Sequence, residues 1–227
     1  MTRMTLSAVR RGFRDILPLA LFVVPFGIAF GVAATEQGMS PAIATAMSAA
    51  VFAGASQFAA LEFWKSPVAV VPLLLVVFAV NARHLLLGAS LFPWMSGVPP
   101  MRRHAAAALI SDANWAYAVD RHRNGEHDLG VLLGSGFAMW IAWVLGTFLG
   151  AAFTNTLIDP AALALDTLMV AFFATVLVGL AKGETAPWPW LVAGVAAVLG
   201  SWLLPAGWHI LAGGVAGGLT GAFLSGR

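Results

Sequence analysis

Long stretches of this 227-residue sequence contain no charged side chain. They cover residues 16–35, 37–61, 66–82 (with an apolar continuation to residue 96), 129–158, 167–181 and 185–226. A helix needs about 20 apolar residues to cross a bilayer. Only 10% of the residues are charged and 60% are hydrophobic, whereas a soluble domain has roughly 25% charged residues. This composition excludes a soluble enzyme, a nucleic-acid-binding protein and a disordered protein, and it indicates a polytopic membrane protein.

The ends of the apolar stretches indicate helices rather than barrel strands. A serine or aspartate, which caps helix N-termini, precedes a proline, which fits the first helical position, at three of these ends. The three pairs are Ser40-Pro41, Ser66-Pro67 and Asp159-Pro160. A barrel strand would alternate apolar and polar residues, and these runs do not. We predict an all-α membrane helical bundle with about seven or eight membrane helices or re-entrant segments.

Two stretches leave alternatives open. Residues 67–96 form either one span or a re-entrant hairpin that turns at residues 81–84. Residues 104–119 are shorter and contain Asp112 and Asn114, so they form either a span with a polar face or a helix at the membrane surface. The sequence does not choose between these arrangements.

A shift of 119 residues aligns two parts of the chain without gaps. It pairs glycines, a helix-starting proline and small residues: Gly27 with Gly146, Gly31 with Gly150, Ala33 with Ala152, Thr35 with Thr154, Pro41 with Pro160 and Ala42 with Ala161. We predict a single transmembrane domain, residues 1–227, in which the halves 10–120 and 128–227 repeat a four-element unit. Duplicated halves are common in transporters, whose sites lie between the halves.

The distribution of arginines predicts the orientation in the membrane. Lys and Arg near span ends favour the cytoplasmic side, and four arginines occur within the first 14 residues. If eight elements cross the membrane, only Arg102 and Arg103 lie on the side opposite to the cytoplasm. If residues 67–96 are re-entrant, these two arginines lie on the cytoplasmic side as well. Both versions predict cytoplasmic N- and C-termini and parallel rather than inverted halves.

The densest polar cluster within an apolar stretch spans residues 81–84. A charge at the bilayer centre costs at least about 2.5–3.5 kcal/mol on insertion scales, so such residues usually face the protein interior and have a role. Arg83 is a candidate to bind a substrate carboxylate as a bidentate fork, with Asn81 beside it. His84 is a candidate proton relay, with a hydrogen-bonded structural histidine as the alternative. The structural alternative is that Arg83 forms an ion pair or extends from a helix end toward the interface.

Small residues and two carboxylates complete the candidate site. Gly54, Ser56 and Gln57 lie inside the second apolar stretch, where small residues allow either tight helix packing or local unwinding around a ligand. Asp112 and Asp166 are candidates to bind a substrate ammonium or a coupling ion, and either could instead pair with Arg83. For Asp112 and Asn114, a solvated helix face is the further alternative.

Sequence motifs of catalysis are missing. The sequence has no cysteine, no GxxxxGK[ST] nucleotide-binding loop and no HExxH metal motif. We therefore expect no enzymatic activity, no cofactor and no metal site.

Three segments resemble the signature of the AzlC family, in order and in spacing. They are Pro25 to Gly31 (PFGIAFG), Val51 to Phe58 (VFAGASQF) and Asn81 to His84 (NARH). The chain length matches as well, and the resemblance covers nearly the whole chain. The chain departs from the family at Ala82, where an aliphatic residue is expected, and at Ala113, where an acidic residue is expected.

The resemblance implies a function. Members of the family are large subunits of branched-chain amino acid exporters that work with a small, multi-spanning AzlD-type partner. We therefore expect a secondary transporter subunit in the cytoplasmic (inner) membrane that exports branched-chain amino acids, with coupling to an ion gradient. Its partners would be an AzlD-like hydrophobic subunit and the bilayer, with no nucleic acid. The alternatives are an exporter of another small solute, a channel, and a non-transporting membrane scaffold.

Overall fold

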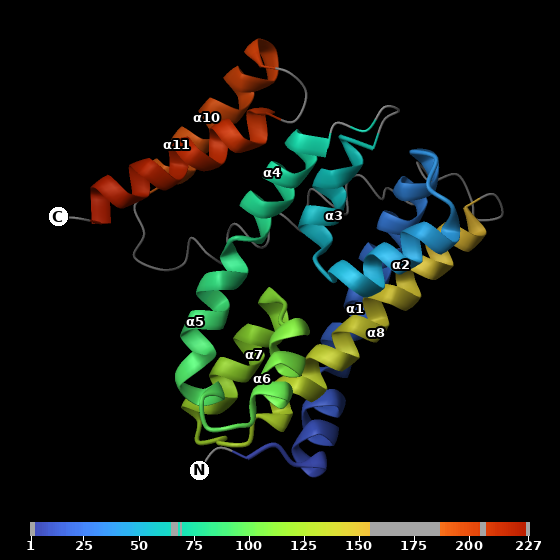
Figure 1. Cartoon of the computed structure of the whole chain (residues 1–227), viewed down its shortest axis with the longest axis vertical. Helices are drawn as coiled ribbons and strands as arrows, with labels where there is room; N and C mark the ends of the chain where they lie inside the picture. Colours follow the sequence, from blue (N-terminus) through green and yellow to red (C-terminus); the bar gives the residue numbers. More distant parts are fainter. Residues whose placement is uncertain (1–2, 65–67, 69, 155–186, 205–207, 226–227) are drawn as a thin grey trace. The chain divides into compact units, whose positions relative to one another are not determined.

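The structure is a computed structural model that describes the greater part of the chain (Figure 1): residues 3–64, 68, 70–154, 187–204 and 208–225. These residues form α-helices and no strand, apart from one isolated bridge between Arg3 and Asp128. The predicted all-α fold is confirmed. The apolar stretch 167–181 and the helix starts predicted at 66–67 and 159–160 lie outside the described residues.

The chain divides into two compact units. Unit 1 comprises Met1–Gly54 and Asn81–Leu157, and unit 2 comprises Ala55–Val80 and Ile158–Arg227. Most of the candidate site residues belong to unit 1, and each unit is described by itself below.

Unit 1 is built on two long parallel helices, α1 (Leu6–Glu36) and α8 (Gly130–Phe153). Their glycines bring the two backbones into contact. A Cβ built on Gly27 would lie 2.8 Å from the carbonyl oxygen of Trp143 and 3.0 Å from the Cα of Gly146. Small residues allow such a close approach of membrane helices, so these glycines have a packing role.

Residues 119 positions apart face each other along this helix pair. Besides Gly27 and Gly146, a Cβ on Gly12 would clash with the backbone of Val131. Farther along, the hydroxyl oxygens of Thr35 and Thr154 lie 2.8 Å apart. A constant offset along two helices means that they run parallel and in register. The offset equals the shift that aligns the two parts of the sequence, while the duplication itself stays a prediction.

The second apolar stretch is not one helix. α2 (Pro41–Val51) begins after Ser40, whose side chain accepts a hydrogen bond from the Ile43 N–H (3.3 Å), as the Ser-Pro pair predicts. α2 ends at Phe52, which has a left-handed backbone with φ 44°, and α3 (Gly54–Leu61) follows. Such a conformation is strained for a bulky side chain, so the surrounding packing must hold it. The structure shows a break in the helix at this stretch, while unwinding around a ligand stays a prediction.

The third apolar stretch keeps a helical backbone at its polar cluster. α4 (Val70–Asn81) and α5 (Arg83–Met95) are separated by Ala82 alone, whose dihedral angles (φ −55°, ψ −28°) are right-handed helical. Residues 70–95 are a 26-residue apolar helical stretch, long enough to cross a membrane. Ala82 shows no reversal of the chain, which favours the span over the re-entrant hairpin.

The stretch 104–119 is divided between two short helices. α6 (Pro100–Ala108) has 9 residues and α7 (Asp112–Arg123) has 12, so each is too short to cross a bilayer alone. Ser111 caps α7: its Oγ accepts from the Asn114 N–H (3.4 Å), and Asn114 Oδ1 accepts from the Ser111 N–H (2.6 Å). This capping box interrupts the helix. The predicted single element, whether span or surface helix, is wrong.

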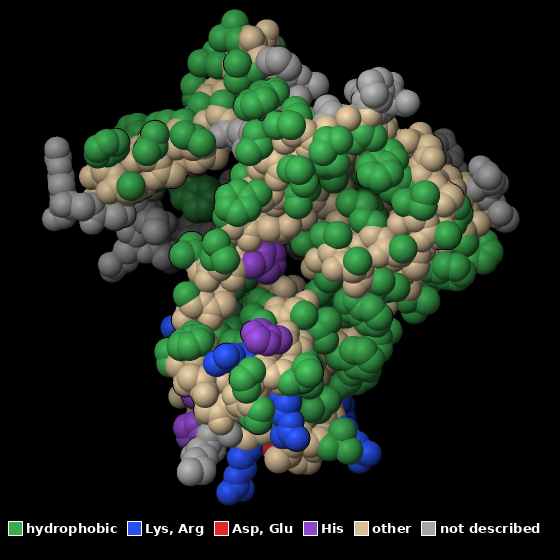
Figure 2. Space-filling model, in the orientation of Figure 1, with side chains coloured by type: hydrophobic (Ala, Val, Ile, Leu, Met, Phe, Trp, Pro, Cys, Tyr) green, Lys and Arg blue, Asp and Glu red, His purple; other side chains and the backbone are tan. Residues whose placement is uncertain are grey.

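One end of unit 1 carries most of its arginines (Figure 2). A hydrophobic core closes this end and joins α5, the residues around α6 and α7, and the start of α8; it includes Trp94, Ile110 and Leu132, with Met4 packed against it. The guanidinium of Arg103 lies 5.6 Å from the ring centre of Phe92 in α5. The start of α6, with Arg102 and Arg103, therefore lies at the same end as the N-terminus. This placement differs from the eight-span count, which separated them, and the membrane topology itself stays a prediction.

In unit 2, α10 (Trp188–Leu203) and α11 (Trp208–Ser225) lie side by side. Glycines again allow the contact, because a Cβ on Gly213 would lie 2.8 Å from the carbonyl oxygen of Ala193. Within the described residues, the helical stretches 6–36, 70–95 and 130–153 are long and apolar enough to cross a membrane, and α2, α10 and 212–224 are shorter apolar helices.

Candidate solute-binding site

Arg83 and Asp112 form the ion pair that the structural alternative predicts, with Arg83 Nη1 and Asp112 Oδ2 2.9 Å apart, while substrate binding by either residue stays a prediction. Arg83 is the first residue of α5, and Asp112 is the first residue of α7. A carboxylate in the first turn of a helix is stabilised by the helix dipole. The two side chains are 37% and 51% exposed, so the pair lies open to a ligand or to water rather than inside the core.

The guanidinium of Arg83 can donate further hydrogen bonds besides those of this ion pair. Its Nε is buried and has no hydrogen-bond partner among the described residues. Beside it, His84 Nδ1 donates to the backbone carbonyl oxygen of Asn81 (3.2 Å), because a carbonyl oxygen only accepts. This bond leaves Nε2 of a neutral His84 as an acceptor. The predicted residues Asn81, Arg83, His84 and Asp112 thus occur together in unit 1.

Asn114 has a structural role. It is fully buried, and its Nδ2 donates to the carbonyl oxygen of Leu109 (2.9 Å) while its Oδ1 accepts from Ser111. The alternative of a solvated helix face is therefore wrong for Asn114. Asp112, two residues earlier, is exposed and faces Arg83. The pattern Ser111-x-x-Asn114 was the sequence signal for this cap.

The break after α2 packs against aromatic residues of α8. A Cβ on Gly54 would lie 2.8 Å from Cη2 of Trp143, so the glycine makes room for the indole. Trp140 Nε1 donates to the carbonyl oxygen of Ala49 (2.9 Å), in the last turn of α2. These contacts explain how Phe52 is held in its left-handed conformation. Here Gly54 has a packing contact, while its predicted contact with substrate stays a prediction.

The remaining predicted site residues lie elsewhere. Ser56 and Gln57 are fully buried and belong to unit 2. Asp166 lies outside the described residues. The predictions that these three residues bind substrate, and that Asp166 binds an ion, stay predictions.

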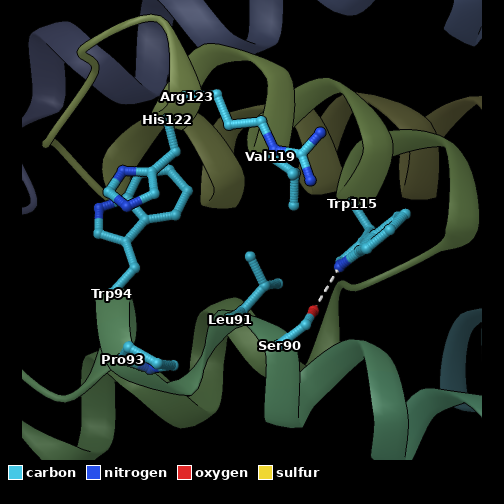
Figure 3. Close-up of a pocket in the computed structure, with 8 residues that line it drawn as sticks. All are labelled: Ser90, Leu91, Pro93, Trp94, Trp115, Val119, His122 and Arg123. Carbon is cyan, nitrogen blue, oxygen red and sulfur yellow. Dashed lines mark hydrogen bonds between the residues drawn. The ribbon is translucent and has the colours of Figure 1, made fainter.

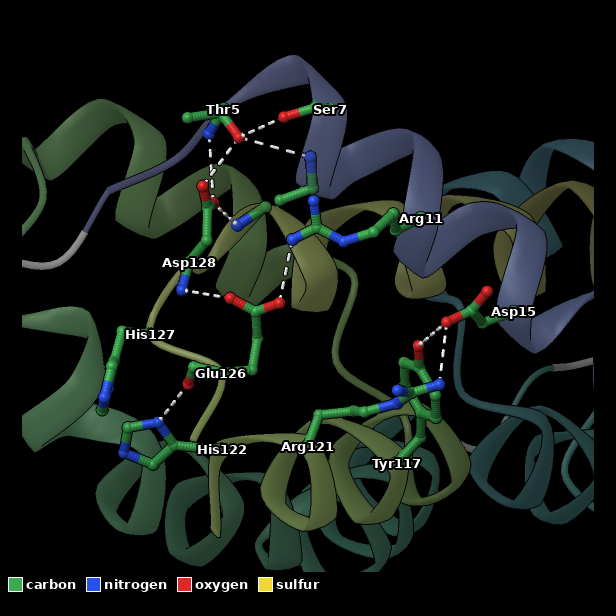
Figure 4. A network of polar contacts seen from close by, with 12 residues as sticks. Thr5, Ser7, Arg11, Asp15, Tyr117, Arg121, His122, Glu126, His127 and Asp128 are labelled. Atoms are coloured by element: carbon green, nitrogen blue, oxygen red, sulfur yellow. Dashed lines mark hydrogen bonds and ion pairs between the residues drawn. The ribbon is translucent and has the colours of Figure 1, made fainter. Parts of the chain in front are cut away.

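Ion pairs that the sequence analysis did not identify connect α1 with α7 and the loop that follows it (Figure 4). Arg11 Nη2 lies 2.9 Å from Glu126 Oε2, and Arg121 Nη2 lies 2.8 Å from Asp15 Oδ2. The Tyr117 hydroxyl donates to the same oxygen of Asp15 (3.2 Å). The arginines at this end are thus partly neutralised within unit 1.

Asp128 fastens the start of α1 to the start of α8. The N–H and hydroxyl of Thr5 donate to its two oxygens (3.1 and 2.7 Å), and the Gly130 N–H donates to Oδ1 (2.9 Å). Burial by itself raises the pKa of Asp128, but these hydrogen bonds and the nearby Arg11 outweigh burial and lower the pKa. Its position just before an apolar run was the available sequence signal, because acidic residues favour helix starts.

A metal centre is not evident in the part of the chain that the structure describes. No group of three or more His, Cys, Asp and Glu side chains there is arranged to hold an ion. The ionisable groups at the candidate site are the guanidinium of Arg83, the carboxylate of Asp112 and the imidazole of His84.

Comparison with known proteins identifies the family. The profile of the AzlC family, described as AzlC protein, matches residues 18–157, which is more than half of the chain. The chain belongs to the AzlC family. The matched region contains the Arg83–Asp112 pair and ends before Asp166, and this AzlC-family chain is a membrane protein with several apolar helices.

Two relatives are similar to this AzlC-family chain. The inner membrane protein YgaZ of Escherichia coli (strain K12) is 31% identical over 146 residues, which cover 62% of this chain and 58% of YgaZ. An uncharacterized membrane protein of Archaeoglobus fulgidus is 30% identical over 149 residues, 66% of this chain and 64% of the relative. The chain thus matches about three fifths of the length of these relatives. No solved structure matches it.

Proposed function

We propose that this AzlC-family protein is the large subunit of a secondary transporter that exports branched-chain amino acids across the cytoplasmic membrane. The family resemblance supports this substrate class and a small AzlD-like hydrophobic partner. The arginine-rich end of unit 1, which carries the N-terminus, supports a cytoplasmic N-terminus. An ion gradient drives the export, since the sequence contains no GxxxxGK[ST] loop for ATP hydrolysis.

The observation that carries the proposal is the ion pair of Arg83 and Asp112. An amino acid zwitterion needs a cation for its carboxylate, an anion for its ammonium and apolar surroundings for its side chain. The pair offers both charges 2.9 Å apart, and the apolar segments 70–80 and 85–95 flank Arg83. A zwitterion enters between the two side chains and replaces each partner with a group of the same charge. No charge is left unpaired in the bound state.

The same pair provides a means of ion coupling. A proton or a cation that binds Asp112 competes with the substrate ammonium for this carboxylate, so the coupling ion and the amino acid bind in turn. Asp112 is half exposed, so protons reach it from water. His84, one residue from Arg83, serves as the relay. Asp166 is a second candidate for the coupling carboxylate.

Efflux from proteoliposomes tests the proposal. Vesicles that hold the chain, with and without its small partner, are preloaded with radiolabelled leucine, isoleucine or valine. We expect saturable efflux that unlabelled branched-chain amino acids inhibit and that Arg83→Ala abolishes. Equal far-UV circular dichroism spectra of the variant and the wild-type protein show that the variant folds. Arg102→Ala removes the same charge from an exposed position and serves as the matched control.

Each other outcome has a definite meaning. Absence of efflux for all three amino acids, even with the partner present, contradicts the proposed substrate class. Flux that rises linearly with concentration and cannot build a gradient indicates a channel. An intact complex that transports none of a wide set of solutes indicates a scaffold.

A further inference from the structure

A groove between α5 and α7 lies in unit 1, apart from the residues proposed to bind the amino acid (Figure 3). Its volume is about 250 Å³. Ser90, Leu91, Pro93 and Trp94 line it from α5, and Trp115, Val119, His122 and Arg123 line it from α7. The groove lies at the arginine-rich end of unit 1, next to the hydrophobic core that closes this end.

The walls of the groove are mostly apolar, and the N–H groups of its two indoles are already hydrogen-bonded. Trp115 Nε1 donates to Ser90 Oγ (2.9 Å), and Trp94 Nε1 donates to the carbonyl oxygen of His127 (3.1 Å). The two indoles are therefore fixed, and Leu91 and Val119 lie between them (Figure 3). Such a surface suits a hydrocarbon chain rather than a polar solute.

One cation extends over this apolar surface. Arg123 lines the groove together with Val119, and the two side chains overlap in the view of Figure 3. Arg11, Arg83 and Arg121 have carboxylate partners, whereas Arg123 has no ion pair within the described residues. The groove therefore combines an unneutralised cation with an apolar wall.

We propose that this groove binds an anionic phospholipid, with the phosphate on Arg123 and an acyl chain along Leu91 and Val119. Charge complementarity supports this occupant. The segments that form this end of unit 1 contain eight arginines (positions 3, 10, 11, 14, 102, 103, 121 and 123) and four carboxylates (positions 15, 120, 126 and 128). Tryptophans and basic residues gather where helices meet lipid headgroups, and anionic headgroups bind basic pockets there. The apolar wall favours a lipid over a soluble anion.

Native mass spectrometry of the purified, detergent-solubilised chain tests the lipid site. The protein is titrated with phosphatidylglycerol or with phosphatidylcholine that has the same acyl chains, and the first lipid adduct is quantified. We expect tighter binding of phosphatidylglycerol, weakened about fivefold in Arg123→Gln and largely restored in Arg123→Lys. Arg10→Gln removes the same charge from an exposed position outside the groove and should leave the first adduct unchanged.

A second variant tests the apolar part of the groove. Val119→Trp fills the groove without a change in charge, and it should reduce binding of both lipids while far-UV circular dichroism stays unchanged. Equal losses in Arg123→Gln and Arg10→Gln would indicate general charge attraction and overturn the proposal. Displacement of the lipid by an equal concentration of glycerol phosphate would show that a free anion is the ligand, which also overturns it.

Discussion

Replacement of Gly27 by alanine tests the close packing of α1 against α8. The new Cβ would lie 2.8 Å from the carbonyl oxygen of Trp143, whereas ordinary contact begins at 3.4 Å. The helices would have to separate by the difference, about 0.6 Å. Overpacking of this kind costs about 1–3 kcal/mol, and the better helix propensity of alanine offsets about 1 kcal/mol of it. The net loss in the free energy of unfolding is therefore about 0–2 kcal/mol.

Gly88→Ala in α5 is the matched control. Nothing lies within 4 Å of a Cβ at Gly88, so alanine there gains helix propensity alone, about 1 kcal/mol. The two variants should differ by about 1–3 kcal/mol. Denaturant-induced unfolding in detergent micelles, followed by far-UV circular dichroism, measures this difference. If Gly27→Ala is as stable as Gly88→Ala, the backbone contact between α1 and α8 does not exist in the protein.

Three further predictions concern other parts of unit 1. The hydrogen bonds of Asp128 stabilise the fold fully above the unfolded-state pKa of about 3.9, and this stabilisation is lost as the pH falls through the lowered pKa of the folded state. Hydrogen exchange at the Thr5 amide, measured relative to its intrinsic rate at each pH, should therefore accelerate only below about pH 4. An acceleration between pH 7 and 5 would contradict this. The buried hydroxyls of Ser48 and Thr147, 2.8 Å apart, should show a coupling energy of about 0.6–1.5 kcal/mol in a double-mutant cycle with valine and alanine, against zero for an incidental contact. A cysteine at Arg102 should react with an impermeant maleimide from the same side of the membrane as a cysteine appended to the N-terminus, and reaction from opposite sides would support the eight-span count instead.

The long helices were predictable because charge and hydropathy determine them directly. α1 and α8 contain the uncharged runs that begin at Ile16 and Leu129, and no other structure hides so many backbone groups from lipid. The glycines that pack them were visible as steps of four residues, Gly27 to Gly31 and Gly146 to Gly150. Local sequence therefore predicted both the helices and their contact.

The breaks between helices were harder to predict because the hydropathy of the sequence does not change at them. Phe52 carries no preference for a left-handed backbone, and tertiary contacts such as that of Trp140 with Ala49 hold the break. The interruption before α7 had a local signal in the capping box of Ser111 and Asn114. Hydropathy, by which membrane spans are identified, does not show this signal.

The candidate site was predictable only in part. Arg83 was recognisable because a charge in an apolar stretch is costly, and Asp112 was one of two carboxylates proposed as its partner. Local sequence could not identify Asp112 as the partner of Arg83, since the two residues are 29 positions apart in the chain and only the fold brings them together. The contacts of Asp15 and Asp128 were missed because charges outside the apolar runs also suit a solvated surface.

Exchange of the two charges in the candidate site tests the central claim most directly. Leucine efflux is measured from proteoliposomes that hold Arg83→Asp, Asp112→Arg or both substitutions together. A substrate-binding pair predicts that both single variants are inactive and that the double variant stays inactive although it unfolds at the wild-type temperature, because the carboxylate and ammonium sites have changed places around the substrate. Recovery of wild-type efflux in the double variant would show that the pair is structural and would contradict the proposed site.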